Sequence, residues 1–244
     1  MIRVLLCFLL AVSAMQSAKA QEVVADISEH LVAISTGFTG SKLLLFGAME
    51  KDAKVIVVVR GPDGPVTMRR KGRVAGIWMN KDSLKFETVP SYYAVLTSHP
   101  INEIIDETTA MVQEIGFDHL VLRPEKIHEA AYVIPFREAL VRKNTQRNLF
   151  QIGENEIEII RDKLFRTDVH FPANAPVGSY WIQVYLFVNG DIVSAQSSVL
   201  PVGKVGMTEN IYNLAHDYGL LYGLLAVFIA VVAGWIASVV FRKR

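Results

Sequence analysis

The sequence predicts a mainly β protein: an immunoglobulin-like antiparallel sandwich with a helical insertion, followed by one C-terminal transmembrane helix. Three observations predict this fold class. Short β-branched runs alternate with turn residues in both halves of the chain, about residues 98–150 keep helical spacing instead, and residues 219–241 hold no charged side chain. With 51% hydrophobic residues, the whole chain is also more apolar than an ordinary soluble domain.

Residues 1–20 are typical of a cleaved export signal. Arg3 supplies a positive start, residues 4–15 form an apolar run, and 18–20 are an A-x-A cleavage site. An uncleaved anchor is the alternative, but this run reaches only about 18 Å as a helix, against a hydrocarbon core of about 30 Å. The only cysteine, Cys7, lies in this segment, so we expect neither disulfides nor Cys-ligated metals in the mature chain.

Residues 21–205 are expected to form the sandwich. In its first half, a turn cluster of glycine, proline and aspartate at 61–65 separates a β-branched run from the segments that follow. Close spacing of short strands and turns is typical of an antiparallel sandwich. The expected strands of this half are 43–46, 54–59, 66–68, 74–79 and 84–89.

The middle of the chain predicts helices. Apolar residues keep helical spacing over 101–115 until Gly116, and 129–143 predict a second helix, which Pro135 either kinks or opens. We interpret residues 98–150 as an insertion within one sandwich. Two domains divided near Gly116 are the alternative.

The strands after the insertion have the clearest patterns. Residues 165–171 alternate between apolar and polar side chains, whereas 180–188 are apolar on both faces and indicate a central strand. Asn189-Gly190 predicts a two-residue hairpin turn into the return strand. An immunoglobulin-like sandwich fits these strands, without the cysteine pair that would make the assignment specific.

Residues 219–241 predict a single membrane span. A helix of this length is about 34 Å long, which is enough to cross a bilayer with some tilt. By the positive-inside rule, the basic residues at 242–244 form a cytoplasmic tail. The bulk of the chain, with a juxtamembrane segment at 206–218, is then expected outside the cytoplasm. A tail-anchored protein with its bulk in the cytosol is the competing topology, and the export signal argues against it.

Small residues recur along this span at three- and four-residue spacing, so they share one face of the helix. Such a face lets another helix approach closely, either from a second copy or from a polytopic membrane protein. Ordinary membrane-helix composition is the alternative interpretation. The helix-packing residues are Gly219, Gly223, Ala226, Ala230, Ala233 and Ala237.

The densest positive patch of the exported domain contains Arg69, Arg70, Lys71 and Arg73, and we expect Arg60 to lie across the same hairpin. Strand alternation places Arg69, Lys71 and Arg73 on one face, with Arg70 opposite. Together with Arg60, this face could bind an oxyanion, anionic lipid or an acidic partner. The interpretation that we favour is a solvated hairpin whose charges prevent edge-to-edge pairing.

Charge and motifs exclude several classes of function. Residues 21–217 carry 20 basic and 24 acidic side chains, which excludes a strongly basic nucleic-acid binder. The segment 36–42 lacks the phosphate-loop pattern, Tyr132 stands where an H-E-x-x-H motif needs its second histidine, and no G-x-S-x-G is present. Asp168 and His170 share a strand face but are too few for a metal site. We therefore expect no catalytic residues, cofactor or metal.

Several motifs distributed over nearly the whole mature chain carry a family resemblance. In these motifs the chain resembles the alphaproteobacterial transmembrane protein family, whose members are exported proteins with one C-terminal span. The resemblance implies an inner-membrane protein that faces the periplasm and has a polytopic partner such as a permease; it supplies no catalytic residues. The motifs are FTGSKLLLFG at 38–47, RRK at 69–71, GIWMN at 76–80, PSYYA at 90–94, LFR at 164–166, PVGSY at 176–180, YG at 222–223 and GW at 234–235.

Two functions remain. The favoured one is a membrane-anchored binding or accessory subunit that is not an enzyme, in contact with membrane lipid and with another transmembrane helix. The alternative is a periplasmic enzyme or anion-binding receptor that uses the basic hairpin.

Overall fold

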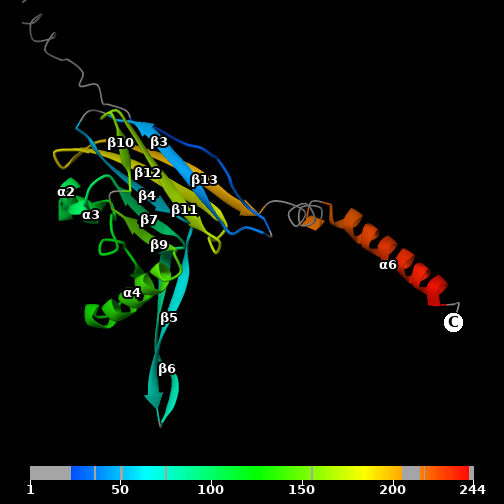
Figure 1. The fold of residues 1–244 in the computed structure, drawn as a ribbon. Helices are drawn as coiled ribbons and strands as arrows, with labels where there is room; N and C mark the ends of the chain where they lie inside the picture. Colours follow the sequence, from blue (N-terminus) through cyan, green and yellow to red (C-terminus); the bar gives the residue numbers. More distant parts are fainter. Residues whose placement is uncertain are drawn as a thin grey trace, which may run out of the picture.

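The computed structural model describes residues 23–35, 37–49, 52–74, 76–154, 156–204, 215–216 and 218–241. The expected export signal, most of the juxtamembrane segment and the terminal tail at 242–244 lie outside these ranges. The predicted fold class is confirmed: the protein is mainly β, with several antiparallel sheets and one apolar C-terminal helix (Figure 1).

Two sheets form the body of the protein (Figure 1). Neighbouring strands are antiparallel except in the pairs β2–β13 and β7–β9. The four-stranded sheet has the order β1 (Val24–Ile27), β3 (Gly40–Ala48), β11 (Leu164–Pro172), β10 (Glu158–Ile160). The six-stranded sheet has the order β2 (Val32–Ile34), β13 (Asp191–Lys204), β12 (Gly178–Val188), β4 (Lys54–Arg60), β7 (Tyr93–Thr97), β9 (Phe150–Gly153).

The two sheets take their strands from both halves of the chain. The central pairs β3–β11 and β4–β12 each join segments that are far apart in the sequence. Near the start of β12, the Tyr180 hydroxyl donates to the carbonyl oxygen of Pro176 at 2.6 Å. The predicted turn at Asn189-Gly190 is confirmed, because both residues adopt positive φ and Val188 pairs with Asp191.

The core lies between the two sheets. Alternating residues of β3 and β11 point inward, and the strands of the six-stranded sheet supply the opposite layer. Tyr92, Phe171 and Tyr180 form a buried triad whose ring centroids lie 5.3 to 5.7 Å apart. Other core residues include Leu43, Leu45, Val55, Val57, Val59, Phe165, Val169 and Ile182.

The segment 98–150 contains α2 (Ile101–Ile104), α3 (Glu107–Val112), α4 (Ala130–Thr145) and the short β8 (Arg123–Pro124). A continuous helix over 101–115 is therefore wrong. Ile105 is extended and buried, which ends α2, and the Asp106 carboxylate caps α3 by accepting from the Thr109 amide at 2.9 Å. The second predicted helix is confirmed as α4, with Pro135 inside it.

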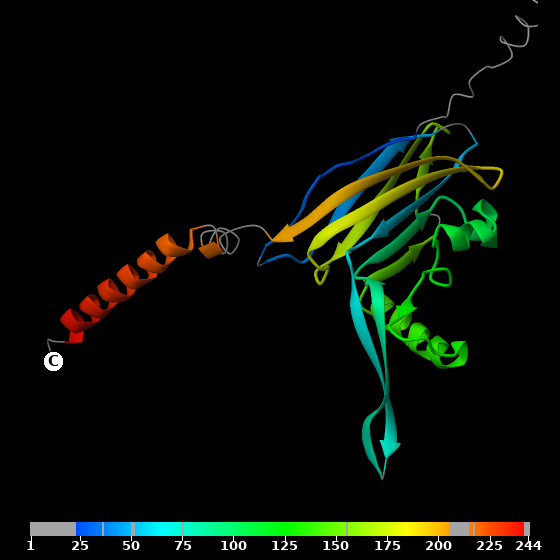
Figure 2. The same ribbon diagram turned by 180° about the vertical axis from the view of Figure 1, so that it is seen from behind.

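A long hairpin of β5 (Asp63–Val74) and β6 (Ile77–Pro90) projects from the sandwich (Figures 1 and 2). The predicted strand at 74–79 is wrong, because the chain reverses within it. Gly76 has a φ of +84°, a left-handed conformation that favours glycine, and Val74 pairs with Ile77. Among the hairpin side chains whose burial is described, Met68, Leu84 and Phe86 in the proximal half are buried.

The C-terminal helix α6 (Gly219–Phe241) has the bounds that the sequence predicts. The segment Gly219–Ser238 has a mean hydropathy of 2.4. Its most apolar stretch is not buried against the rest of the described chain. The helix is long and apolar enough to span a membrane.

Candidate functional site

The hairpin leaves the sandwich at the end where the last strand finishes. In the six-stranded sheet, Trp181 pairs with Arg60 on one side and with Val199 on the other. β4 ends at Arg60 and leads directly into the hairpin, while β13 runs on from Val199 to Lys204. The hairpin and the chain segment leading to α6 therefore start from the same end of this sheet.

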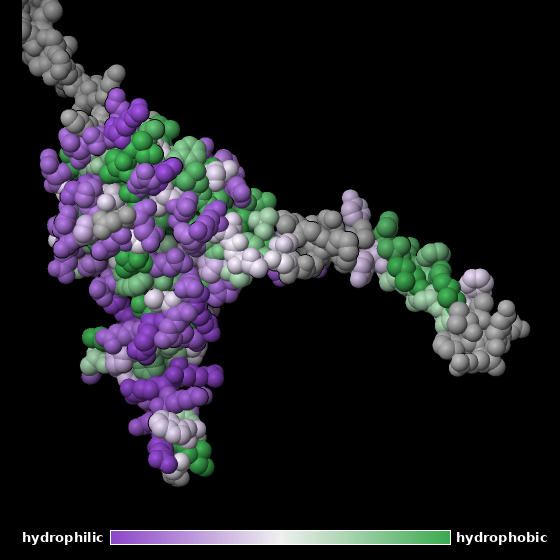
Figure 3. Space-filling view, viewed as in Figure 1, coloured by the Kyte–Doolittle hydropathy of each residue, from purple (hydrophilic) through white to green (hydrophobic). Residues whose placement is uncertain are grey.

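The tip of the hairpin is apolar and exposed. Three consecutive side chains, Ile77, Trp78 and Met79, are 71%, 68% and 51% exposed. Figure 3 shows hydrophobic atoms at the end of the hairpin, beyond a band of hydrophilic residues. Single exposed apolar residues are ordinary, but a contiguous apolar group at the end of a projection marks an interaction site.

One face of the distal hairpin is basic. Arg69, Lys71 and Arg73 alternate along β5, and Arg73 lies opposite Trp78 in β6. Among the described residues, no carboxylate forms an ion pair with any of the three. The Arg73 Nε donates to the carbonyl oxygen of Gly76 at 3.1 Å, so part of this guanidinium holds the turn.

The other face fixes the hairpin to the domain. Arg70 forms an ion pair with Asp82, its cross-strand partner, and its guanidinium lies 5.6 Å from the centroid of the Phe136 ring on α4. Lys81 is the additional residue of a β-bulge between the pairs Arg70–Asp82 and Lys71–Asn80. Arg70 therefore has a structural role, whereas Arg69, Lys71 and Arg73 face outward.

Charge is distributed unevenly between this hairpin and the rest of the domain. Residues 69–82 hold five basic side chains and one acidic side chain. The remainder of 21–217 holds fifteen basic and twenty-three acidic side chains. The distal hairpin is thus a positive projection from an acidic body. Near an anionic surface, this charge distribution favours the orientation in which the hairpin points toward the surface.

The prediction that Arg60 lies across the hairpin from Arg69 is wrong. The strand that pairs with β5 is β6, and Arg60 instead ends β4 in the six-stranded sheet. Its guanidinium donates to the Asp63 carboxylate at 3.1 Å and to the Glu114 carboxylate at 2.8 Å. Arg60 therefore joins the base of the hairpin to the loop after α3, and its charge is neutralised there.

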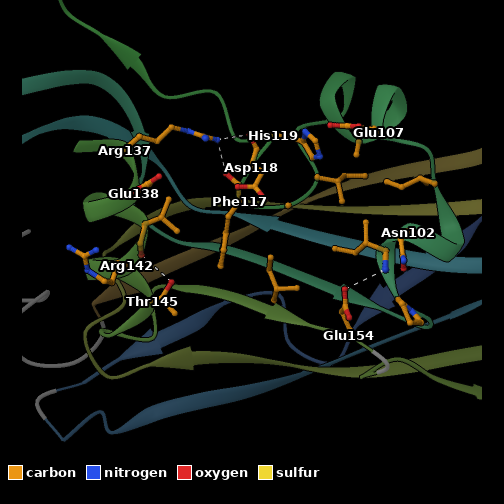
Figure 4. A pocket seen from close by; sticks show the side chains of 18 of the residues that line it. Asn102, Glu107, Phe117, Asp118, His119, Arg137, Glu138, Arg142, Thr145 and Glu154 are labelled. Atoms are coloured by element: carbon orange, nitrogen blue, oxygen red, sulfur yellow. Dashed lines mark hydrogen bonds between the residues drawn. The ribbon is translucent and has the colours of Figure 1, made fainter. Parts of the chain in front are cut away.

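A second feature, which the sequence did not indicate, is a groove of about 1180 Å³ between the helical segment and β9 (Figure 4). Its polar side chains come from separate parts of the chain, so no local motif could reveal it. They include Asn102, Glu107, His119, Arg137, Arg142 and Glu154.

One wall of the groove is the loop after α3, which two side chains hold in place. The Arg137 guanidinium donates to the carbonyl oxygens of Phe117 at 2.7 Å and Asp118 at 2.6 Å (Figure 4). The Tyr93 hydroxyl donates to the Glu114 carbonyl oxygen at 2.6 Å and accepts from the Gly116 amide at 2.9 Å. Within the described residues, no three His, Cys, Asp or Glu side chains are arranged to hold a metal ion.

The outer face of the four-stranded sheet carries an apolar patch. Val24, Ala48 and Leu164 are neighbours across β1, β3 and β11, and Phe46 and Leu44 continue the patch along β3. All five side chains are exposed. Asp26 and Arg166 flank Phe46 on the neighbouring strands and Asp168 lies beside Leu44, so the patch is a narrow apolar strip with charged side chains along its edges.

The six predicted helix-packing residues, from Gly219 to Ala237, all lie on α6 and are exposed. Their spacing of three and four residues places them on one side of the helix. Contact between this stripe and another helix stays a prediction.

A comparison with curated proteins gave no match to this chain. A family model described as "Putative transmembrane protein (Alph_Pro_TM)" matches residues 22–243, which include the sandwich, the hairpin and α6. Because this match covers nearly the whole chain, the protein belongs to the alphaproteobacterial transmembrane protein family that Alph_Pro_TM describes.

Proposed function

We propose that the protein is a binding subunit of a membrane complex or transporter, without enzymatic activity of its own. In this proposal α6 anchors it in the inner membrane, and the sandwich faces the periplasm. The observation that carries the proposal is the apolar patch of Val24, Leu44, Phe46, Ala48 and Leu164 on the outer face of the four-stranded sheet. Covering this patch with a protein partner would remove exposed apolar area from water.

The small-residue stripe of α6 supports a partner within the membrane. Large side chains are absent from that side, so another helix can approach the backbone closely there. The partner helix would come from a second copy of this chain or from a polytopic protein such as a permease. Leu220, Leu224 and Val227 would then face lipid.

Site-specific photocrosslinking of the full-length protein in its native membrane tests the proposal. A photoreactive residue at Phe46 should give a crosslink to one membrane protein, or to a second copy. The matched control is Trp181, which is 52% exposed but lies on the outer face of the other sheet. Equal crosslinking from both positions, or none from Phe46, would contradict a partner on the four-stranded sheet.

The membrane contact has its own test. Gly223→Leu should hold two helices apart and weaken the complex by about 1 kcal/mol or more, whereas Leu224→Ala should have little effect. Crosslinking between single-cysteine variants of α6 measures the difference, because Cys7 is the only native cysteine and lies in the expected export signal. If cysteines on both sides of the helix crosslink equally, the stripe is ordinary membrane composition.

The proposed orientation is tested separately. The mature chain should begin at Gln21, and intact-mass measurement of the purified protein checks this. Protease added to spheroplasts should digest the sandwich. A retained Met1 or a protected sandwich would contradict the periplasmic location.

The alternative function is an anion receptor, or an enzyme, that uses the basic hairpin. The position of Arg60 weakens it, because the remaining cations lie along an open strand and do not converge on one enclosed point. Calorimetric titration of the full-length protein with inorganic sulfate or phosphate tests the receptor. Saturable binding that Arg69→Ala and Lys71→Ala both weaken would favour this alternative over the partner-binding proposal.

A further inference from the structure

We infer that the tip of the β5–β6 hairpin docks on the surface of the membrane that α6 spans. Ile77, Trp78 and Met79 enter the boundary between headgroups and acyl chains, and Lys71 and Arg73 bind anionic lipid headgroups. This inference is separate from the proposed function, because it concerns a different surface and a lipid ligand.

The composition of the tip matches the membrane interface. Trp78 combines a large apolar ring with an N–H donor, which is why tryptophan gathers at the level of the headgroups. Ile77 and Met79 flank it and are also exposed. In water these three side chains are unfavourably hydrated, and insertion into the interface removes that exposed apolar area.

The charges next to the tip match an anionic surface. Arg73 pairs with Trp78, and Lys71 pairs with Asn80 two residues further from the turn, so both basic side chains lie on the same face as Trp78. They have no carboxylate partner among the described residues, so both are available to lipid phosphates. Each basic residue near an anionic membrane contributes about a fivefold increase in binding.

The position of the hairpin allows the contact. It starts from the same end of the six-stranded sheet as the segment that leads to α6. The part of β5 from Arg69 to Val74 extends about 20 Å at ~3.3 Å per residue. Fourteen residues separate Lys204 from Gly219, and this length spans at most about 50 Å. The tip can therefore reach the bilayer while α6 crosses it.

The packed base makes the projection stiff. Met68, Leu84 and Phe86 are buried, and Arg70 binds both Asp82 and the Phe136 ring. An isolated two-stranded ribbon is only marginally stable in water, so these contacts hold the tip in a defined direction. Docking then loses little additional conformational entropy.

Tryptophan quenching in proteoliposomes tests the inference. The full-length protein is reconstituted with Trp78 as its only tryptophan, through Trp181→Phe and Trp235→Phe. Vesicles of phosphatidylcholine with increasing phosphatidylglycerol carry bromine on the acyl chains. Trp78 emission should be quenched and blue-shifted as the phosphatidylglycerol fraction rises. Lys71→Gln with Arg73→Gln should lower the ratio of docked to undocked tip, obtained from the quenching, roughly 25-fold.

The matched control is a protein with Trp181 as its only tryptophan, whose side chain is similarly exposed but lies on the sandwich. Its emission should not respond to brominated lipid. An NBD label on Ile77→Cys, in the otherwise native background with Cys7→Ser, repeats the measurement without replacing a tryptophan. If neither Trp78 emission nor NBD emission responds to the lipid, the inference is overturned. The apolar tip would then be a binding site for a protein. Equal quenching in pure phosphatidylcholine, or after charge removal, would overturn the role of Lys71 and Arg73.

Discussion

Arg73 lies directly opposite Trp78 at the end of the β5–β6 hairpin, so a cation and an indole share one face of the projection. Neither residue contributes to the packed base, which is formed by Met68, Leu84 and Phe86. The hairpin therefore has two parts with different roles. Its proximal half stabilises the domain, and its distal half is available for binding.

This division predicts opposite effects of two substitutions in one hairpin. Trp78→Ala should change the free energy of unfolding by no more than about 0.5 kcal/mol, because the side chain is exposed. Phe86→Ala should cost about 3 to 5 kcal/mol, because the ring is fully buried. Urea unfolding of the full-length protein in detergent micelles, followed by circular dichroism, measures both values. A large loss of stability in Trp78→Ala would contradict an unpacked tip.

The hydrogen bond from Tyr180 to Pro176 should stabilise the sandwich. Tyr180→Phe keeps the ring between Tyr92 and Phe171 but leaves the Pro176 carbonyl oxygen without this donor. We expect a loss of about 1 kcal/mol in the free energy of unfolding. The neighbouring exposed Trp181 supplies the control, because Trp181→Phe should be nearly neutral in the same urea titration.

The aromatic core also predicts the response to alkaline pH. Burial raises the pKa of the Tyr180 hydroxyl to about 12, and burial also raises the pKa of Tyr92. An unfolded tyrosine has a pKa of about 10, so as the pH rises the unfolded chain loses these protons before the folded chain does. The stabilising contribution of these buried tyrosines should be fully present below about pH 10 and should be lost as the pH rises toward 12. Urea midpoints measured across this range should fall, and Tyr180→Phe should reduce the decline.

Arg60 and Arg69 belong to the same basic cluster in the sequence, yet they should behave differently. Arg60→Gln removes the links to Asp63 and Glu114, and we expect a loss of about 1 kcal/mol. Arg69→Gln removes an exposed charge and should be neutral for stability. Thermal unfolding of the two variants at the same ionic strength compares them. Equal stability would contradict a structural role for Arg60.

The groove wall should depend on Arg137. Arg137→Gln removes the donors to the carbonyl oxygens of Phe117 and Asp118, and such hydrogen bonds from a charged group contribute about 1.5 to 3 kcal/mol. Amide hydrogen exchange should therefore accelerate over residues 115–122. Arg142, on the same helix, makes no hydrogen bond to this loop within the described chain, so Arg142→Gln serves as the control. Unchanged exchange in Arg137→Gln would show that the loop is held by other contacts.

The candidate site was only partly predictable. Alternation along β5 was enough to place Arg69, Lys71 and Arg73 on one face, because strand periodicity is a local property. Alternation could not predict the position of Arg60, because that position depends on which strand pairs with β5. The apolar tip was hidden for a related reason: residues 74–79 have the composition of a strand, and only the turn at Gly76 exposes Ile77 and Trp78.

By itself the sequence determined the mainly β class, the bounds of α6 and the turn at Asn189-Gly190. These features follow from local physics: a continuous apolar run must be helical to satisfy its backbone in lipid, and positive φ at two successive residues requires particular side chains. Only the tertiary structure decided that Ile105 ends one helix, that Arg60 is neutralised by Glu114, and that a groove separates α4 from α3. Each of these depends on contacts between segments far apart in the chain, whose burial outweighs local preference.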